Sequence, residues 1–489
     1  MTALDVPDNA RSRVQNIGLA AGPFLAAIVF FMFRPDGLPM AGTATAAFAL
    51  WMAIWWATEA IPVAATAFLP LILFPIFNVT PMTETAAKYG HPIIFLFLGG
   101  FVIALAIERS GLHVRAALKV FRRAGLNGSS LVGGFMLSAA LISMWISNTS
   151  TTLMLLPIAA SVTLVIRDTM KKLSKTELRN FETSMLLGLA YGATLGGMAT
   201  LVGTPPNAFM AGFMADTYGV EIDFARWMLV GLPIAAIMLP LTWLALTKFL
   251  YPVNFKATPE ARDYINNLSK DLGPMSKAER RIGVLFLILV AGWLMRKPFM
   301  SATGITGITD TTIAMAAALA AFIIPSGKDG EALMTWETMK ALPWGVLILF
   351  GGGLALAAGM TASGLTLWLG EQLAPLVSIH LAVLILASVL LVIFLTEMTS
   401  NLATTATILP VMAAIAVKTG YDPLVFVIPV TLAASCAFML PVATPPNAIV
   451  FSSGKVSIPR MMRAGLVLNL LGVLVLSAVA LKVVPLVFG

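Results

Sequence analysis

The chain has 489 residues, of which 58% are apolar and only 11% are charged, against roughly 45–50% and 25% in an ordinary soluble domain. This composition excludes a soluble enzyme and predicts a helical protein that crosses a membrane several times. The formal net charge of +8 is first a signal of loop orientation, because cytoplasmic loops are enriched in Lys and Arg. One cysteine, Cys436, and three scattered histidines argue against a cysteine or histidine metal site.

Apolar runs of transmembrane length recur along the chain. The N-terminal stretch is polar and is not followed by the short apolar core and A-x-A site of a cleaved signal, so we expect a cytoplasmic tail at 1–16. A spanning helix needs about 20 apolar residues, and the first is expected within 17–43. Divided at charged, Pro and Gly clusters, the runs lie near 17–33, 44–57, 61–77, 91–108, 128–166, 184–215, 227–250, 281–297, 310–324, 343–368, 380–417, 423–453 and 464–487.

Two of these runs, 128–166 and 380–417, are too long for a single span. The first contains no Asp, Glu, Lys or Arg, and the second contains only Glu397. We expect each to enter the membrane and return to its own side as a re-entrant hairpin. The runs 184–215 and 423–453 each contain a Pro-Pro pair, which a continuous helix cannot hold without breaking. We therefore expect two broken helices.

The distribution of basic residues predicts the topology. If the N-terminus is cytoplasmic and both hairpins return to their own sides, most of the 31 Lys and Arg residues fall on the cytoplasmic side, as the positive-inside rule requires. The predicted fold is an all-α polytopic membrane protein with eleven transmembrane helices and two re-entrant hairpins. Its C-terminus is then external.

Two motifs recur in the same order in the two halves of the chain. Ser-Asn at 147–148 recurs at 400–401, and Thr-Pro-Pro-Asn-Ala at 204–208 recurs at 444–448. Each half has five spans, an odd number, so the second copy enters the membrane from the opposite side. The predicted organisation is a tail at 1–16, a first transmembrane helix at 17–43, inverted repeats at 44–251 and 281–489, and between them a cytoplasmic linker with a surface helix at 252–280.

The middle of each hairpin carries hydroxyl and amide groups, which are costly to place in hydrocarbon without hydrogen-bond partners. The first reads Ser-Met-Trp-Ile-Ser-Asn-Thr-Ser-Thr-Thr over 143–152, so its backbone must be buried in protein or line an aqueous cavity. The hydroxyls either bond to neighbouring helices or form a binding tip, and their recurrence favours a tip. The Pro-Pro elements either kink a helix for packing or free carbonyl and N–H groups that bind ions. Each Pro-Pro element occurs together with a hairpin tip in its half of the chain, which favours ion binding over a packing kink.

Neither tip and neither Pro-Pro element contains Lys, Arg or His. A dianion bound there would need bound cations such as Na⁺ to offset the cost of its transfer, which predicts a cation-coupled carrier of anions. Glu397 would orient the second tip or take part in cation or proton coupling, whereas Glu59 would be a structural cap in preference to a ligand. A membrane-embedded enzyme needs a nucleophile with a base or a metal cluster, and the motif-bearing runs contain no Asp and almost no His. We therefore expect no enzyme.

Five motifs are shared with a known family. They are Trp-Ala-Thr-Glu-Ala-Ile-Pro at 56–62, Ser-Asn-Thr at 147–149, Gly-Thr-Pro-Pro-Asn-Ala at 203–208, Thr-Glu-Met-Thr-Ser-Asn at 396–401 and Ala-Thr-Pro-Pro-Asn-Ala at 443–448. Together they resemble the divalent anion/sodium symporter family. The resemblance implies a homodimer whose protomers each have a scaffold domain and a transport domain that moves by an elevator mechanism. It also implies Na⁺-coupled symport of C4 dicarboxylates such as succinate, fumarate and malate across a bacterial inner membrane. Citrate or sulfate as substrate, or Na⁺-independent anion exchange by the same fold, are the alternatives.

The resemblance implies two sodium sites and one substrate site. The sodium ligands would be Ser143, Ser147, Asn148 and the carbonyl of Gly203 at the first site, and Thr396, Thr399, Asn401 and the carbonyl of Ala443 at the second. The substrate carboxylates would meet Asn148, Thr149, Thr204, Pro205, Asn401, Leu402, Thr444 and Pro445. Leu402 departs from the symmetric pattern, because Thr149 stands at the matching position of the first tip. The missing hydroxyl is worth about 0.5–1.5 kcal/mol, so we expect Leu402 to alter substrate preference.

Overall fold

The structure, a computed structural model, describes residues 11–123, 125, 127–328, 330–372 and 379–489. Most of the tail expected at 1–16 lies outside these residues. Within them the regular structure is helical, and nine helices are long and apolar enough to cross a membrane. These nine are Arg13–Met32, Met40–Thr58, Met82–Ser110, Asn148–Thr169, Phe224–Leu250, Lys277–Thr303, Trp344–Ala362, Asn401–Lys418 and Ile458–Phe488.

The four motif-bearing runs each fold as two helices. In the first half these are α8 (Gly128–Ser143) and α9 (Asn148–Thr169), then α10 (Lys175–Met198) and α11 (Pro205–Tyr218). In the second half they are α18 (Leu381–Thr396) and α19 (Asn401–Lys418), then α20 (Pro423–Ser435) and α21 (Pro445–Ser452). Both Pro-Pro pairs occupy the first turn of a helix, where the missing N–H costs no hydrogen bond. The pairs therefore start α11 and α21 and do not kink a continuous helix.

The other helices of the described chain complete the bundle. They are α1 (Arg13–Met32), α2 (Met40–Thr58), α5 (Met82–Ala87), α6 (Pro92–Ser110), α7 (Leu112–Phe121), α12 (Phe224–Leu244) with its π-helical continuation Ala245–Leu250, α13 (Pro259–Asp271), α14 (Lys277–Thr303), α15 (Asp310–Ile323), α16 (Trp344–Ala362), α17 (Leu365–Gln372), α22 (Ile458–Lys482) and α23 (Val484–Phe488), besides the short α3 and α4. α13 falls within the stretch 252–280, for which a surface helix is expected.

The run near 61–77 forms two short helices where one span is expected. α3 covers Val63–Thr66 and α4 covers Leu69–Ile76. Pro70 stands in the first turn of α4, and its ring and missing N–H disfavour continuation of α3 through this point. Hydrophobicity alone does not distinguish this interrupted segment from a continuous span.

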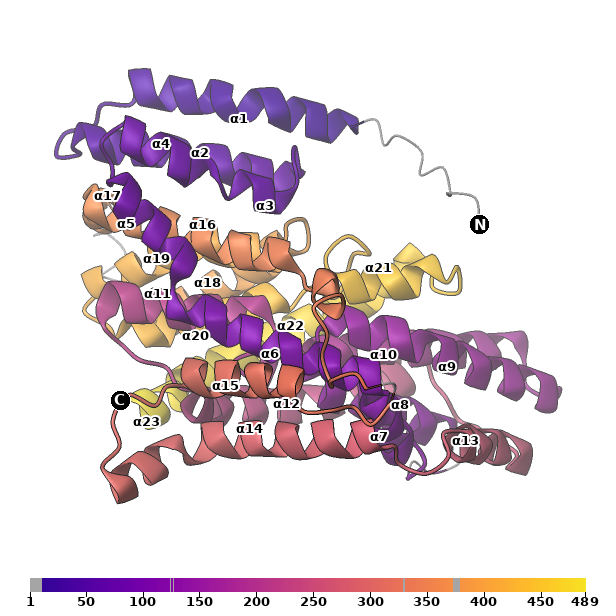
Figure 1. The fold of residues 1–489 in the computed structure, drawn as a ribbon. Coiled ribbons are helices and arrows are strands. Elements are labelled where there is room, and N and C mark those ends of the chain that lie inside the picture. The colour runs from indigo at the N-terminus through magenta and orange to yellow at the C-terminus, as the bar shows by residue number, and fades with distance from the viewer. Residues whose placement is uncertain (1–10, 124, 126, 329, 373–378) are drawn as a thin grey trace.

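The long helices run side by side, and the two ends of the bundle carry different elements (Figure 1). α7, α13 and the outer end of α9 lie at one end, and α13 packs against both of its neighbours. α1 begins at this same end, and α23 lies at the opposite end. The first and the last helices of the described chain therefore start and finish at opposite ends of the bundle.

The two halves of the chain interlock through the broken helices. α11 packs against α19 and α20, while α21 packs against α9 and α10. Every residue of α10 from Phe181 to Met198 is buried. The Tyr191 hydroxyl of α10 donates to the carbonyl O of Phe438 at 2.8 Å and so joins the two broken helices. The breaks thus lie inside the protein, where neighbouring groups can satisfy the freed backbone.

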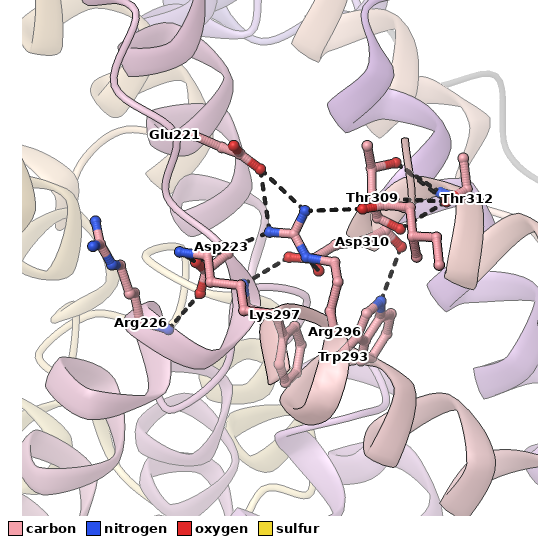
Figure 2. A network of polar contacts seen from close by, with 11 residues as sticks. Glu221, Asp223, Arg226, Trp293, Arg296, Lys297, Thr309, Asp310 and Thr312 are labelled. Carbon is pink, nitrogen blue, oxygen red and sulfur yellow. Dashed lines mark hydrogen bonds and ion pairs between the residues drawn. The ribbon is translucent and has the colours of Figure 1, made fainter. Parts of the chain in front are cut away.

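A partly buried ionic cluster ties the start of α12 to α14 and α15 (Figure 2). The side chain of Arg296 is 6% exposed, and its guanidinium lies 3.0 Å from Asp310 and 3.2 Å from Glu221. The neighbouring Lys297 ammonium lies 2.5 Å from Asp223. Buried charges are stable only when they are paired. These ion pairs therefore fix the position of the loop before α12.

Asp223 makes the stabilisation of the fold by this cluster dependent on pH. It caps α12 by accepting the N–H of Arg226 at 2.8 Å. Burial raises the pKa of Asp223, but its bond to Lys297, the Arg226 N–H and the charge of Arg296 outweigh burial and hold that pKa below its usual value. Because the folded-state pKa is depressed, the carboxylate stabilises the fold above its unfolded pKa of about 3.9, and this stabilisation is lost as the pH falls through the folded-state value.

We expect Asp223→Asn to reduce the stability of the fold at neutral pH by about 1–3 kcal/mol. The difference from wild type should shrink below about pH 4, where the wild-type carboxylate also becomes neutral. Thermal unfolding of the purified protein over a pH series measures both effects. Glu84→Gln, at an exposed carboxylate, controls for the change of net charge. A stability difference that stays constant down to the acid end of the series would contradict this prediction.

Candidate functional site

The tip of the first hairpin brings oxygen atoms together. Ser143 ends α8 and Asn148 begins α9, and the Ser143 hydroxyl donates to Asn148 Oδ1 at 2.5 Å. Gly197, near the end of α10, lies against this pair. A Cβ at Gly197 would stand 2.5 Å from Asn148 Oδ1 and 3.0 Å from the carbonyl O of Gly203. The bare backbone at Gly197 therefore allows side-chain and carbonyl oxygens from three segments to approach one another.

The second tip has the same arrangement with a threonine in place of the serine. Thr396 ends α18 and Asn401 begins α19, and Thr396 Oγ1 lies 2.9 Å from Asn401 Oδ1. The same hydroxyl lies 2.7 Å from the carbonyl O of Ala434 in α20. Ser143 and Thr396 are both fully buried. Each tip therefore presents a buried hydroxyl paired with the amide of the first residue of the following helix.

The second hydroxyl expected at each sodium site makes local bonds. Ser147 is the N-cap of α9 and accepts the N–H of Ser150 at 3.1 Å. Thr399 donates to the carbonyl O of Leu395 at 3.0 Å and also contacts the hydroxyl of Thr404. The structure thus forms one hydroxyl–amide pair at each tip. Ser147 and Thr399 instead make hydrogen bonds within their own turns.

Two asparagines that the sequence did not single out hold the unwound segments. Asn207 donates from Nδ2 to the carbonyl O of Thr200 at 2.8 Å, and Asn447 donates to the carbonyl O of Leu440 at 3.0 Å. Both side chains are fully buried. Among the described residues, neither Oδ1 has a hydrogen-bond partner. Each asparagine is thus hydrogen-bonded to the unwound segment that carries a predicted carbonyl ligand. Its place in the repeated Thr-Pro-Pro-Asn element is the sequence signal that could have identified it.

Glu397 ties the second tip to the second unwound segment. Its side chain is buried, and four donors converge on the carboxylate. These are the N–H groups of Phe438 at 2.8 Å, Met439 at 2.9 Å and Leu440 at 3.1 Å, and Nδ2 of Asn469 at 2.7 Å. Hydrogen bonds from consecutive backbone N–H groups stabilise an anion without a nearby cation. This geometry supports the orienting role considered for Glu397, since its oxygens are already engaged.

Glu59 is placed differently from Glu397. It is the C-cap residue of α2, with a left-handed backbone at φ 47°, and its side chain is exposed. Its carbonyl O accepts from the side-chain amide of Gln15 at 3.2 Å. Its position therefore agrees with the structural cap expected from the sequence.

Aromatic rings anchor the first tip. At the position matching Glu397 the first tip carries Met144, and the next residue, Trp145, stacks on Phe224 of α12 with centroids 6.0 Å apart. Phe224 in turn stacks on Trp293 of α14 at 4.3 Å. Offset stacking of this kind adds about 0.5–1.5 kcal/mol per pair beyond burial. The two tips are thus alike in their polar pairs but are supported by different contacts.

The expected substrate residues differ in exposure. Thr204 and Thr444 are the N-caps of α11 and α21, both with φ −144°, and each is 4% exposed. The half-buried residues are Asn148, Thr149, Pro205 and Asn401, and Pro445 is exposed. Leu402 is buried in the apolar core, whereas the matching Thr149 is half-buried. Thr204, Thr444 and Leu402 are therefore buried to a similar degree, and Leu402 is the apolar member of the three.

The tips have a donor set that suits a hard monovalent cation. Their side-chain and carbonyl oxygens are neutral ligands of the kind that bind cations at broken helices in transporters. The starts of α9 and α19 add backbone N–H groups that favour an anion, whereas α11 and α21 each begin with two prolines, which have no N–H. Cations bound by the tips would supply the positive charge that the surrounding side chains lack.

Comparison with known proteins supports this interpretation of the fold. Residues 14–488 match the family described as Sodium:sulfate symporter transmembrane region. The sodium-dependent dicarboxylate transporter SdcS of Staphylococcus saprophyticus is 40% identical over 97% of this chain and 92% of its own length. SdcS of Staphylococcus aureus USA300 gives the same values. The crystal structure of the Alcanivorax borkumensis YdaH transporter, described as having an unusual topology, covers 90% of this chain with a TM-score of 0.59, 16% identity and 98% of that chain aligned.

A helical bundle with paired hairpin tips and broken helices, together with this family match, defines a polytopic membrane transporter and not an enzyme. The match covers nearly the whole chain. The protein belongs to the sodium:sulfate symporter family.

Proposed function

We propose that the protein is a secondary active transporter that couples Na⁺ entry to symport of C4 dicarboxylates such as succinate, fumarate and malate across a bacterial inner membrane. The observation that carries this proposal is the pair of buried hydroxyl–amide tips, Ser143–Asn148 and Thr396–Asn401, in segments without Lys, Arg or His. A dianion between them is stabilised only when cations occupy the neighbouring oxygens. The SdcS relatives, named as sodium-dependent dicarboxylate transporters, support the choice of dicarboxylate.

The proposed topology has eleven transmembrane helices and two re-entrant hairpins, with the N-terminus cytoplasmic and the C-terminus external. The opposite positions of α1's start and α23 support it (Figure 1). The helices of 44–251 and 281–489 form the inverted repeats in this proposal, and the interlocked broken helices support that division. Movement of the tips and broken helices against the other helices, as an elevator within a homodimer, would expose the site to each side in turn.

Uptake into proteoliposomes tests the proposed function. Labelled succinate should accumulate when an inward Na⁺ gradient is imposed, and it should not accumulate when choline replaces Na⁺. Equal uptake in choline would overturn the proposal and would favour a Na⁺-independent exchanger of the same fold. Unlabelled fumarate, malate, citrate and sulfate, each added as competitor, then rank the anions. Competition by citrate or sulfate stronger than that of the C4 acids would replace the proposed substrate class.

Leu402 offers a test of substrate preference. We expect Leu402→Thr to restore a hydroxyl at the second tip and to change the relative affinities for competing anions more than it changes expression. One hydroxyl is worth about 0.5–1.5 kcal/mol, or roughly two- to tenfold in affinity. Leu409→Thr, at a fully buried leucine farther along α19, controls for a hydroxyl placed in the core. A competition profile unchanged from wild type would show that Leu402 does not contact the substrate.

A further inference from the structure

A basic cavity of about 490 Å³ lies away from the hairpin tips. It is bounded by the last turns of α9, the first two turns of α10 and the loop between α21 and α22. The lining residues are Arg167, Lys175, Leu178, Arg179, Glu182, Gly454, Lys455, Val456 and Ser457. Four cations thus face one carboxylate. The volume is within the range of about 300–1,000 Å³ found for small-molecule sites.

The charges in the cavity do not cancel. Glu182 pairs with Arg167. Within the described part of the chain, no ion pair involves Lys175, Arg179 or Lys455. Lys175 and Arg179 are four residues apart, so they project from the same face of α10. Three cations from two separate segments therefore converge without a carboxylate to neutralise them.

The start of α22 adds to this positive potential. Ser457 is its N-cap and no side chain caps its first turn, in which Pro459 has no N–H and Ile458 keeps one. The partial positive charge of a helix N-terminus favours a bound anion. Arg460 in the same turn donates to Asn180 Oδ1 at 2.6 Å and fixes the start of α22 beside α10. The helix start and the three cations thus lie where α10 meets α22.

Loop orientation alone does not explain this convergence. The positive-inside rule is met by basic residues anywhere on the cytoplasmic loops, as by Lys171 and Lys172, which are exposed between α9 and α10 and do not line the cavity. An arginine fork, two lysines and a helix start around one space form a set that binds the tetrahedral oxygens of a phosphate group.

We propose that this cavity binds a phosphate group, carried either by a soluble phosphorylated anion or by the head group of an anionic phospholipid. The bound group would bridge α10 of the first half to the α21–α22 loop of the second half. Occupancy therefore stabilises the contact between the two halves at this end of the bundle. The site is separate from the proposed sodium and substrate sites and does not depend on which anion is transported.

Thermal unfolding of the full chain in neutral detergent tests the proposal. The probes are inorganic phosphate, with sodium chloride at matched ionic strength, and phosphatidylglycerol, with phosphatidylcholine as the neutral lipid. We expect a saturable rise in melting temperature with one of the two phosphate sources. Saturation by inorganic phosphate identifies a soluble ligand, and saturation by phosphatidylglycerol alone identifies a lipid.

The variant Lys175→Gln/Lys455→Gln should weaken the apparent affinity about tenfold or more. The matched variant Lys171→Gln/Lys172→Gln makes the same change in net charge and should bind as wild type does. Lys171, Lys172 and Lys175 are exposed and Lys455 is half-buried, and size-exclusion profiles show whether both variants remain folded. Equal shifts in both variants, or shifts reproduced by sodium chloride, would overturn the proposal.

Discussion

Replacing Asn148 or Asn401 by alanine should abolish Na⁺-dependent uptake. Each amide belongs to a buried hydroxyl–amide pair, with Ser143 in the first tip and Thr396 in the second. Each is also the first residue of a helix whose N–H groups face the proposed anion. Loss of the amide removes a cation ligand and a substrate contact together. Contacts with charged partners are worth about 1.5–3 kcal/mol each, so loss of two lowers transport by about a hundredfold or more.

The same proteoliposome assay measures this effect. Asn127→Ala is a suitable control, because Asn127 begins the same hairpin, is exposed and makes no side-chain cap bond. It should transport as wild type does. A Tyr191→Phe variant, which loses the bond to the second unwound segment, should be less stable but should retain Na⁺ dependence. Full activity of Asn148→Ala or Asn401→Ala would remove the proposed assignment of the tips.

Much of this architecture follows from the pattern of charge in the sequence. A run such as 128–166, with no charged residue and too many residues for one span, predicts two helices with a polar turn between them. The Pro-Pro pairs predict where the broken helices resume, since proline suits a first helical turn. The five shared motifs predicted the family, and the comparisons confirm it. The number of spans is less certain from hydrophobicity, as the division of 61–77 into α3 and α4 shows.

The contacts that support the site could not be predicted in the same way. Asn207 and Asn447 were visible in the motif, but their function depends on carbonyls that only the folded backbone brings within reach. Trp145 lies within the first tip, yet its stacking partner Phe224 comes from another helix. Leu402 was expected at the substrate because it matches Thr149, and its contact with the substrate stays a prediction, but the packing of α19 that buries its side chain was not evident from the sequence. Periodicity identifies local structure, and tertiary packing decides which side chain faces the site.

The cavity at the start of α10 illustrates the same limit. Its cations were assigned by sequence to the cytoplasmic loops, and each one satisfies the positive-inside rule alone. Lys455 is far along the chain from Lys175 and Arg179, and nothing in the local sequence predicts their meeting. The interlocked packing of α21 against α9 and α10 brings these segments together. An anion site can therefore be inferred only after the arrangement of the two halves is known.

Glu397, at 3% exposure, is the least exposed acidic residue in the described part of the chain. A buried carboxylate normally requires a cationic partner, but here three consecutive N–H groups and the amide of Asn469 take that role. The segment that donates these bonds also carries Ala443, whose carbonyl is a proposed sodium ligand. We propose that Glu397 is thus a positioning residue for the second sodium site. A proton-coupling role would instead need the carboxylate to gain and lose its proton during transport.

We expect Glu397→Gln to destabilise the fold by about 2–4 kcal/mol and to raise the Na⁺ concentration needed for half-maximal uptake. The glutamine amide keeps one acceptor oxygen but turns an NH₂ group toward at least one backbone N–H, that of Leu440 when the oxygen takes the Oε1 position. This leaves that buried donor and the N–H groups of the amide itself unsatisfied, at about 1–3 kcal/mol for each polar group. Asn469→Ala should change the Na⁺ dependence in the same direction by a smaller amount, because it removes one of the four donors. Glu59→Gln, at an exposed helix cap, should change neither quantity. If Glu397→Gln remained as stable as wild type and only lost the pH dependence of uptake, proton coupling would replace positioning as the role of this carboxylate.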